Sequence, residues 1–202
     1  CNSAATVPTT DEEIYNVTVN GGSTDPLYAN ANGCATPAPG PGSVLGGYSS
    51  FTTLAPITTV TTGQTVAFSI NQDECDGPTY YANGIGVWLD FDHNGSFSDP
   101  GEIVYMDQTT VMGPRTVNGS ITIPPTATTG NTVMRIICAE GYSATSWTPL
   151  VPCLAYGYGE TEDHLINIIA ANPCTGTPDA GDALASAATV CPTAPVNLSL
   201  GN

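Results

Sequence analysis

The sequence has no lysine and only two arginines, Arg115 and Arg135, against 18 acidic residues, which gives a formal net charge of -16. Such a surface repels the phosphates of nucleic acids and of anionic lipids, so the charge balance argues against both as partners. Without lysine, the chain cannot form lysine–asparagine isopeptide crosslinks. The acidity favours divalent cations, although it also serves the solubility of an exported protein.

Long apolar runs are also missing, and no signal peptide is present, so we expect no membrane insertion. The chain starts at Cys1, which is the pattern of a protein whose leader has been removed or of a segment that starts inside a longer protein. A mature lipoprotein also starts with cysteine, so a lipidated Cys1 is the alternative.

There is no Cys-x-x-Cys pair, and only two histidines accompany the seven cysteines, which argues against a zinc site. Cysteines in such Thr/Gly/Pro-rich sequence indicate disulfides in an oxidising, extracellular compartment. We predict two pairs, Cys138–Cys153 around a loop and Cys34–Cys75. The odd number leaves one cysteine that is unpaired, or paired outside these residues.

Helix signals are nearly absent, while short segments rich in Val, Ile, Thr or Tyr alternate with Gly, Pro, Asn or Asp clusters. This pattern predicts an all-β fold, an antiparallel β-sandwich of Ig-like or jelly-roll-like type with long loops stapled by disulfides. The expected strands lie in residues 12–22, 48–54, 64–72, 84–92, 102–106, 119–127, 131–141 and 162–170.

The character of the sequence changes after Ala170, so we expect one domain over residues 1–170 and a linker with the first strand or strands of another module over 171–202. Residues 196–200, VNLSL, alternate as a strand. The Ala-rich segment 179–191 has the one composition that suits a helix, but Gly181 and Pro192 weaken it. A tail folded back on the first domain is the alternative.

The segment 90–102, DFDHNGSFSDPGE, spaces oxygen-bearing side chains as a calcium loop does. Gly95 stands at the sixth position, where the chain must turn sharply, and Gly101 stands where a bidentate glutamate is usual. We predict a structural Ca²⁺ between two strands, held by Asp90, Asp92, Asn94, Ser96 through its carbonyl, Asp99 and Glu102. An ordinary polar turn is the alternative.

Residues 158–168, YGETEDHLINI, resemble the signature of the GEVED domain, a β-sandwich module of secreted and cell-surface proteins, mostly from Bacteroidota. Three further short motifs, at residues 87–102, 121–124 and 134–135, occur in the same order as in that family. The resemblance therefore covers most of residues 10–170. Thr161 and His164 depart from the usual pattern. Residues 172–200 resemble the start of an Ig-like adhesin repeat, and together the two resemblances imply a surface protein exported by type IX secretion.

The acidic residues of this signature cluster beside the final expected strand, while Arg135 is one of only two cations in the chain. We expect a buried ion pair between two neighbouring strands, formed by Arg135 with Glu160, Glu162 and Asp163. A second metal site, or paired carboxylates that hydrolyse a glycoside, are the alternatives.

Aromatic residues gather in and beside the loop between Cys138 and Cys153, where Trp147, Tyr142 and Tyr156 form a possible sugar-stacking surface. Ordinary loop packing is the alternative. Trp88 is expected in the core. His93 and His164 are expected at solvated turn and strand positions, because no nucleophile motif accompanies them.

These features favour a non-enzymatic, calcium-stabilised structural or adhesive module of a bacterial surface adhesin or fibre. Its partners would be neighbouring domains or subunits of that fibre. The alternative is a carbohydrate-binding accessory module of a secreted hydrolase, whose partners would be glycans.

Overall fold

A computed structural model describes residues 1–7, 12–23, 47–74, 77–172, 182–185 and 198–201. The chain divides into two compact units, residues 1–171 and 172–202. The described residues contain strands and no helix, so none of them forms a helix that could cross a membrane. The predicted all-β sandwich is confirmed.

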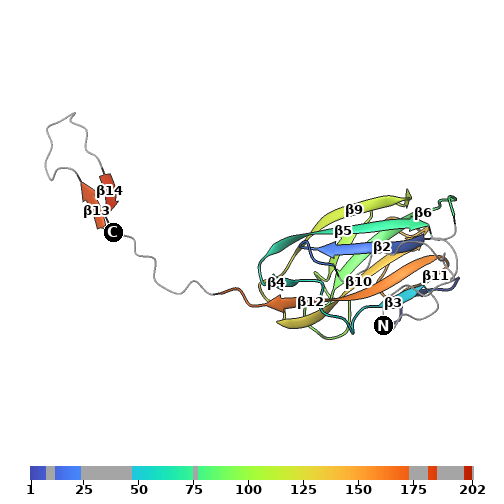
Figure 1. Cartoon of the computed structure of the whole chain (residues 1–202), viewed down its shortest axis with the longest axis horizontal. Coiled ribbons are helices and arrows are strands. Elements are labelled where there is room, and N and C mark those ends of the chain that lie inside the picture. The colour runs from blue at the N-terminus through green and yellow to red at the C-terminus, as the bar shows by residue number, and fades with distance from the viewer. Residues whose placement is uncertain (8–11, 24–46, 75–76, 173–181, 186–197, 202) are drawn as a thin grey trace, which may run out of the picture. The chain divides into compact units, whose positions relative to one another are not determined.

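The smaller layer of the sandwich is a three-stranded antiparallel sheet in the order β2-β5-β9 (Figure 1). Its strands are β2 (Glu12–Val19), β5 (Thr65–Glu74) and β9 (Arg115–Thr122). A β-bulge shifts the register between Ile14 and Asn16. Because the bulge changes the phase of the alternation, Ile14 and Val17 are both buried, which a strict period of two does not predict.

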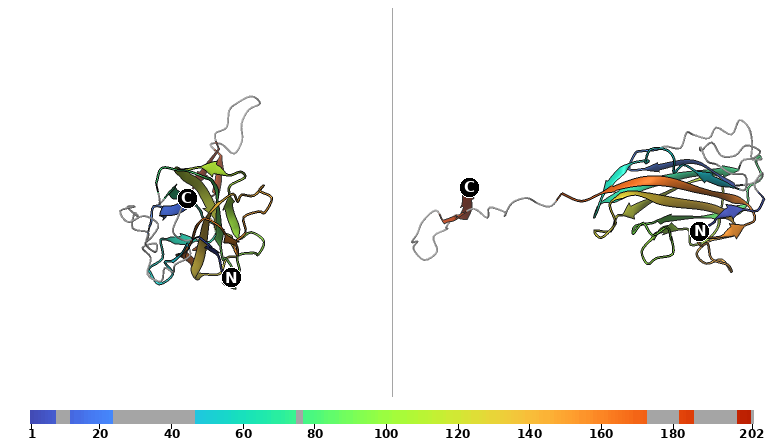
Figure 2. Two further views of the ribbon diagram at one scale, coloured as in Figure 1. Left: turned by 90° about the vertical axis from the view of Figure 1, so that its right-hand side faces the viewer. Right: turned by 90° about the horizontal axis from the view of Figure 1, so that it is seen from below.

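The larger layer has seven strands, with β3-β12-β10-β6-β7 in order, β4 also on β12 and β8 also on β6. Figure 2 shows the strands of the first unit from two further directions. The pairing is antiparallel except that β3 and β4 join β12 in parallel. The strands are β3 (Tyr48–Ser50), β4 (Thr59–Thr61), β6 (Ala82–Leu89), β7 (Ile103–Met106), β8 (Val111–Met112), β10 (Gly130–Glu140) and β12 (Gly159–Ile169).

Two small pairs complete the secondary structure. The parallel pair β1 (Ala4–Ala5) and β11 (Ala155–Tyr156) belongs to the first unit. The antiparallel pair β13 (Asp182–Ala185) and β14 (Leu198–Gly201) belongs to the second. The segment with helix-like composition therefore contains a strand at Asp182–Ala185, and the described part of VNLSL is a strand as expected.

The larger sheet is covered on both faces, which explains the long apolar runs in its central strands. On β10, Met134, Ile136 and Cys138 face the main core between the two sheets. Ile137 and Ala139 of the same strand face a second apolar cluster on the outer side. Trp88 is 2% exposed and belongs to this outer cluster, so its predicted place in a core is confirmed.

The predicted Cys138–Cys153 disulfide is wrong. Cys138 is a free, fully buried thiol in the main core, whereas the disulfide found among the described cysteines joins Cys1 to Cys153 with a Cα–Cα distance of 5.5 Å. Cys138 points to the inner face of β10, while the loop with Cys153 lies on the outer side, so the two thiols cannot meet. The bond also occupies Sγ of Cys1, the atom that lipidation would need. The predicted Cys34–Cys75 pair lies outside the described residues.

Candidate metal centre

The acidic loop closes a β-hairpin, as the strand patterns on either side of it predict. β6 ends at Leu89 and β7 begins at Ile103, and the two strands pair antiparallel. The Leu89 N–H donates to the carbonyl of Glu102 at 2.9 Å, which fixes the two ends of the loop side by side. The loop therefore starts and ends on the rigid sheet, where side chains from its two ends meet.

Backbone N–H groups turn toward the first carboxylate of the loop. Asp90 accepts hydrogen bonds from the N–H groups of Asn94 at 3.1 Å and Gly95 at 3.0 Å. Gly95 has a φ of 78°, a left-handed conformation that costs a non-glycine residue energy. The sharp turn predicted at this glycine is thus present in the backbone.

Three carboxylates converge in this loop. Asp90, Asp92 and Glu102 each offer an oxygen, and these atoms all lie within 4.8 Å of one another. Asp90 and Glu102 are buried, while Asp92 is exposed. Burial raises the pKa of Glu102, hydrogen bonds from the N–H groups of Asp99 and Phe91 lower it, and the charges of Asp90 and Asp92 raise it further.

These residues fit a hard cation. Carboxylate oxygens are the ligands that Ca²⁺ and Mg²⁺ prefer. Neither arginine pairs with this cluster, because Arg115 pairs with Asp107 and Arg135 pairs with Asp163. A cation would supply the positive charge that the convergence of three acids calls for.

The other predicted ligands lie in the same loop. The Asn94 side chain donates to Asp92 at 2.9 Å and to Asp99 at 3.0 Å, and its Oδ1 accepts from the Ser96 N–H at 2.6 Å. Asp99 is not one of the three converging acids. A cavity of about 220 Å³ lies beside the cluster, lined by both ends of the loop and by Pro124, Thr126 and Ala127.

Arg135 and Asp163 form a bidentate ion pair on the outer face of the larger sheet. They are direct neighbours across β10 and β12, and Arg135 donates from Nε at 2.8 Å and from Nη2 at 2.7 Å. Nη1 donates to the carbonyls of Cys1 at 3.1 Å and Pro152 at 2.9 Å. Burial lowers the pKa of Arg135, but Asp163, Tyr48 and Tyr156 together raise it above its usual value, so the guanidinium stays charged.

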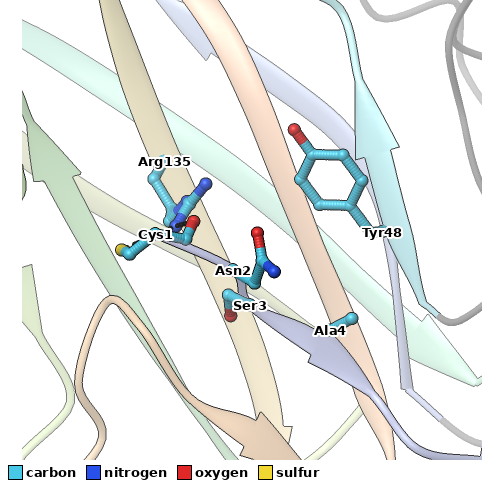
Figure 3. Close-up of a pocket in the computed structure, with 6 residues that line it drawn as sticks. All are labelled: Cys1, Asn2, Ser3, Ala4, Tyr48 and Arg135. Atoms are coloured by element: carbon cyan, nitrogen blue, oxygen red, sulfur yellow. Dashed lines mark hydrogen bonds between the residues drawn. The ribbon is translucent and has the colours of Figure 1, made fainter. Parts of the chain in front are cut away.

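This ion pair joins the segments around the disulfide to the sheet. Figure 3 shows Arg135 beside Cys1 at a pocket of about 360 Å³, with Tyr48 on β3, on the far side of β12 from Arg135. The Tyr48 hydroxyl donates to Asp163 at 2.8 Å. The ring of Phe97, from the acidic loop, lies 4.6 Å from the guanidinium carbon. The loop and the disulfide therefore share one buried cation.

Glu160 and Glu162 do not join Arg135, which corrects the predicted four-residue ion pair. Alternation along β12 places Asp163 on the outer face and both glutamates on the inner face. Glu160 accepts from the Ile14 N–H at 2.8 Å and from the Ser49 hydroxyl at 2.6 Å. It thereby ties β12 to β2 of the other sheet, and burial raises its pKa to about 7.

Glu162 lies 2.9 Å from Nε2 of His164, which stacks on Phe51 with ring centroids 4.6 Å apart. The expectation that His164 is solvated is wrong, because it is completely buried. Burial lowers its pKa to about 3, so the imidazole is neutral at physiological pH. The other histidine, His93, is half-buried in the acidic loop.

A second ion pair, which is partly buried, was not predicted. Arg115 of β9 pairs with Asp107 at 2.5 Å, and the Tyr105 hydroxyl and the Ile85 N–H donate to the same carboxylate. Burial and the neighbouring Asp107 raise the pKa of Tyr105 to about 12. The sequence feature that could have predicted this pair is the scarcity of cations. In so acidic a chain, each of the two arginines is expected to form an ion pair that stabilises the fold.

The structure does not assemble the predicted sugar-stacking surface. Tyr156 is 2% exposed and its hydroxyl lies 2.7 Å from that of Thr161. Tyr142 packs partly buried against the outer apolar cluster. Trp147 alone of these three is fully exposed. The aromatic residues of the loop thus serve mainly to cover the sheet.

Residues 84–167 match the GEVED domain family, which confirms the resemblance over this range. The range runs from β6 to β12 and contains the acidic hairpin, both ion pairs and Glu160. It is narrower than the resemblance, which extends over most of residues 10–170. No curated protein matches the chain.

Solved structures show only distant similarity. A CARDB domain from Pyrococcus furiosus, solved in complex with di-metal ions, has a TM-score of 0.33 and 12% identity over 55% of this chain and 79% of that one. A lytic polysaccharide monooxygenase AA15 from Thermobia domestica in the Cu(I) state has a TM-score of 0.37 and 11% identity over 74% and 77%. At these scores, neither similarity carries an argument about this chain.

Proposed function

We propose that this chain, with its GEVED match over residues 84–167, is a non-enzymatic, extracellular structural or adhesive module of a bacterial surface adhesin or fibre, stiffened by calcium. The observation that carries the proposal is the convergence of Asp90, Asp92 and Glu102 at the ends of one hairpin. A cation there connects two strands of the larger sheet. The proposal also takes the source to be Bacteroidota with type IX export, and residues 171–202 to begin an Ig-like repeat or an intersubunit strand.

Calcium suits the cluster better than magnesium. Ca²⁺ accepts six to eight oxygens in irregular arrangements, whereas Mg²⁺ demands near-ideal octahedral geometry and gives up its waters reluctantly. The cluster offers carboxylates of different exposure, two buried and one exposed. Such a set fits the more tolerant ion.

A structural role agrees with how the reactive groups are placed. The Cys138 thiol is buried, and burial raises its pKa well above the usual value, so it is a poor nucleophile. Both arginines are engaged in ion pairs, buried for Arg135 and partly buried for Arg115. A disulfide and a GEVED match both suit an extracellular module.

Thermal melting with calcium and with EGTA tests the metal. Calcium should raise the melting temperature of the wild type. At a calcium concentration a hundred times its dissociation constant, the free energy of unfolding should increase by about 2.7 kcal/mol. In Asp92→Asn, calcium should stabilise less. In EGTA this variant should be at least as stable as the wild type, because one of three repelling carboxylates is gone.

Asp73→Asn is the matched control, since it removes an equal charge from a partly exposed side chain of β5, outside the loop. It should respond to calcium as the wild type does. If the wild type melted at the same temperature with calcium and with EGTA, the loop would be an ordinary turn and the proposal would be wrong.

The second candidate function is glycan binding, and the full exposure of Trp147 favours it. An exposed indole can stack on a sugar ring. A glycan array with wild type and Trp147→Ala tests this: a signal that the variant loses would support an accessory module of a secreted hydrolase. Electron microscopy of the purified protein adds a contrast, because only the fibre module should form filaments.

A further inference from the structure

Most edge strands of this sandwich are protected against pairing with another chain. β3, β4 and β8 have two or three residues each, and β7 has four with a register shift beside it. β2 has a bulge, and its Ile14 N–H is occupied by Glu160. Short length, bulges and covered backbone groups are the usual ways in which proteins prevent edge-to-edge association.

β9 differs from the other edges. It lies at the end of its sheet and pairs with β5 alone among the described strands (Figure 1). Its eight residues keep an unbroken register with β5. After Arg115 it has no charged residue and no proline, and lysine, the residue that most often blocks such edges, is absent from the chain. Within the part of the chain that the structure describes, one long edge is therefore open for strand addition.

The alternation of β9 specifies the strand that would fit beside it. Val117 and Ile121 are buried in the main core, whereas the side chains between them on the other face, Asn118 and Ser120, are exposed. An added strand should place apolar residues on the core side and small polar residues on the solvent side. Residues 196–200, Val-Asn-Leu-Ser-Leu, have this pattern.

The second unit would gain stability by pairing with a larger sheet. Its described strands, β13 and β14, have four residues each and form a two-stranded sheet, a structure of marginal stability by itself. If β14 joined a larger sheet, it would pack against the core that this sheet covers.

Charge also favours this segment over a second copy of the acidic first unit. Only Asp179 and Asp182 of the 18 acidic residues lie in residues 172–202, and no charged residue follows Asp182. The segment can therefore approach the acidic sandwich without strong repulsion, whereas two sandwiches pairing β9 with β9 would bring their negative charges together.

We propose that β9 accepts strand β14 of a second copy of this chain, so that copies associate head to tail by β-strand addition. The inference rests on the proposed linking role in a fibre and names the two surfaces that make the link. It requires no metal. Because donor and acceptor are different surfaces, the contact does not close on itself and builds a series of growing oligomers.

Complementation between two full-length variants tests the proposal by analytical ultracentrifugation. An edge variant, Asn118→Lys with Ser120→Lys, blocks the acceptor. A strand variant, Leu198→Lys with Leu200→Lys, blocks the donor. Each alone should sediment as a monomer at concentrations where the wild type forms oligomers, and an equimolar mixture should form a one-to-one complex through the remaining acceptor and donor.

Ser69→Lys with Ala67→Lys is the matched control for the edge variant. These residues are the direct cross-strand partners of Asn118 and Ser120, on the central strand β5, so the charge change is equal but the edge is untouched. The control should assemble as the wild type does. Circular dichroism confirms that each variant is folded.

The inference would be overturned by a wild type that is monomeric throughout, by an edge variant that still assembles, or by a strand variant that still assembles. Loss of assembly in the β5 control would also overturn it, since the contact would then be to the sheet face. Repeating the wild type in EGTA separates the two proposals, because assembly should persist there even if calcium proves to bind nowhere.

Discussion

At the scale of single residues, the few cations and buried acids of this chain bind its layers and loops together. Arg135 holds Asp163, the carbonyl of Cys1 and the carbonyl of Pro152. Arg115 connects β9 of the smaller sheet to Asp107 beside the larger one. Through these two carbonyls, Arg135 joins β10 to the segments around the disulfide, and Arg115 joins the two layers, which sheet hydrogen bonds do not connect.

Asp163→Asn should lower the free energy of unfolding by about 3–5 kcal/mol, because the guanidinium of Arg135 then stays buried without a counter-charge. Urea unfolding followed by fluorescence measures the change. Asp73→Asn, which removes a partly exposed charge, should change stability by about 0.5 kcal/mol or less. Equal effects of the two variants would contradict a buried, stabilising ion pair.

Glu160 should make stability depend on pH. Its pKa is raised from 4.5 to about 7, so its contribution is fully present below pH 4.5 and is lost as the pH rises through 7. The stability of Glu160→Gln relative to the wild type should therefore increase between these two pH values and be constant on either side.

The comparison of the two proteins is needed because His164 acts in the opposite direction. Its pKa is lowered from 6.5 to about 3, so its contribution is lost as the pH falls through that range in both proteins. Urea unfolding at a series of pH values gives the difference. Curves that stay parallel from pH 4 to pH 8 would show that Glu160 does not titrate as the structure indicates.

The sequence was informative about which residues matter here and less so about their partners. Period-two alternation along the GEVED-like segment separates Asp163 from Glu160 and Glu162, so the correct pair for Arg135 could have been predicted. The bond from Glu160 to the Ile14 N–H could not, because it depends on a strand from the other sheet. Asp107 and Arg115 likewise meet only through the packing of the two layers.

At the scale of elements, the hairpin of β6 and β7 is the feature that the sequence predicts best. Two strand patterns flank a polar loop with glycine at the turn, and all of this information is local. The disulfide is the opposite case, because it joins residues 152 positions apart. No local pattern specifies that the chain near Cys1 runs beside the loop with Cys153.

Replacing Cys153 by serine should lower stability by about 2–5 kcal/mol, since the bond closes almost the whole first unit into a loop. Chemical denaturation of both proteins measures this. Peptide mapping without reduction should recover Cys1 linked to Cys153.

Cys138 provides the internal control for the disulfide assignment. As a buried thiol with a raised pKa, it should react with iodoacetamide only after the protein is unfolded. A linked peptide of Cys138 and Cys153, or rapid labelling of Cys138 in the native protein, would contradict the structure.

At the scale of the whole molecule, the boundary after Ala171 separates two units of very different size. The change of sequence after Ala170 predicts a boundary at this place, because apolar strand patterns give way to small and polar residues. The sequence does not specify what the second unit pairs with, since a strand such as VNLSL fits any open sheet edge of suitable alternation.

A chain truncated to residues 1–171 should therefore fold by itself, because both apolar clusters, the disulfide and the acidic hairpin lie within this range. In differential scanning calorimetry, the truncated chain should have the same melting temperature as the monomeric full chain. Calcium should raise both melting temperatures equally. A peptide of residues 172–202 should show little structure by circular dichroism, because a two-stranded pair is marginal in water. If instead the truncated chain melted well below the monomeric full chain, the second unit would be part of the fold of the first, and its strand would not be free to serve another copy.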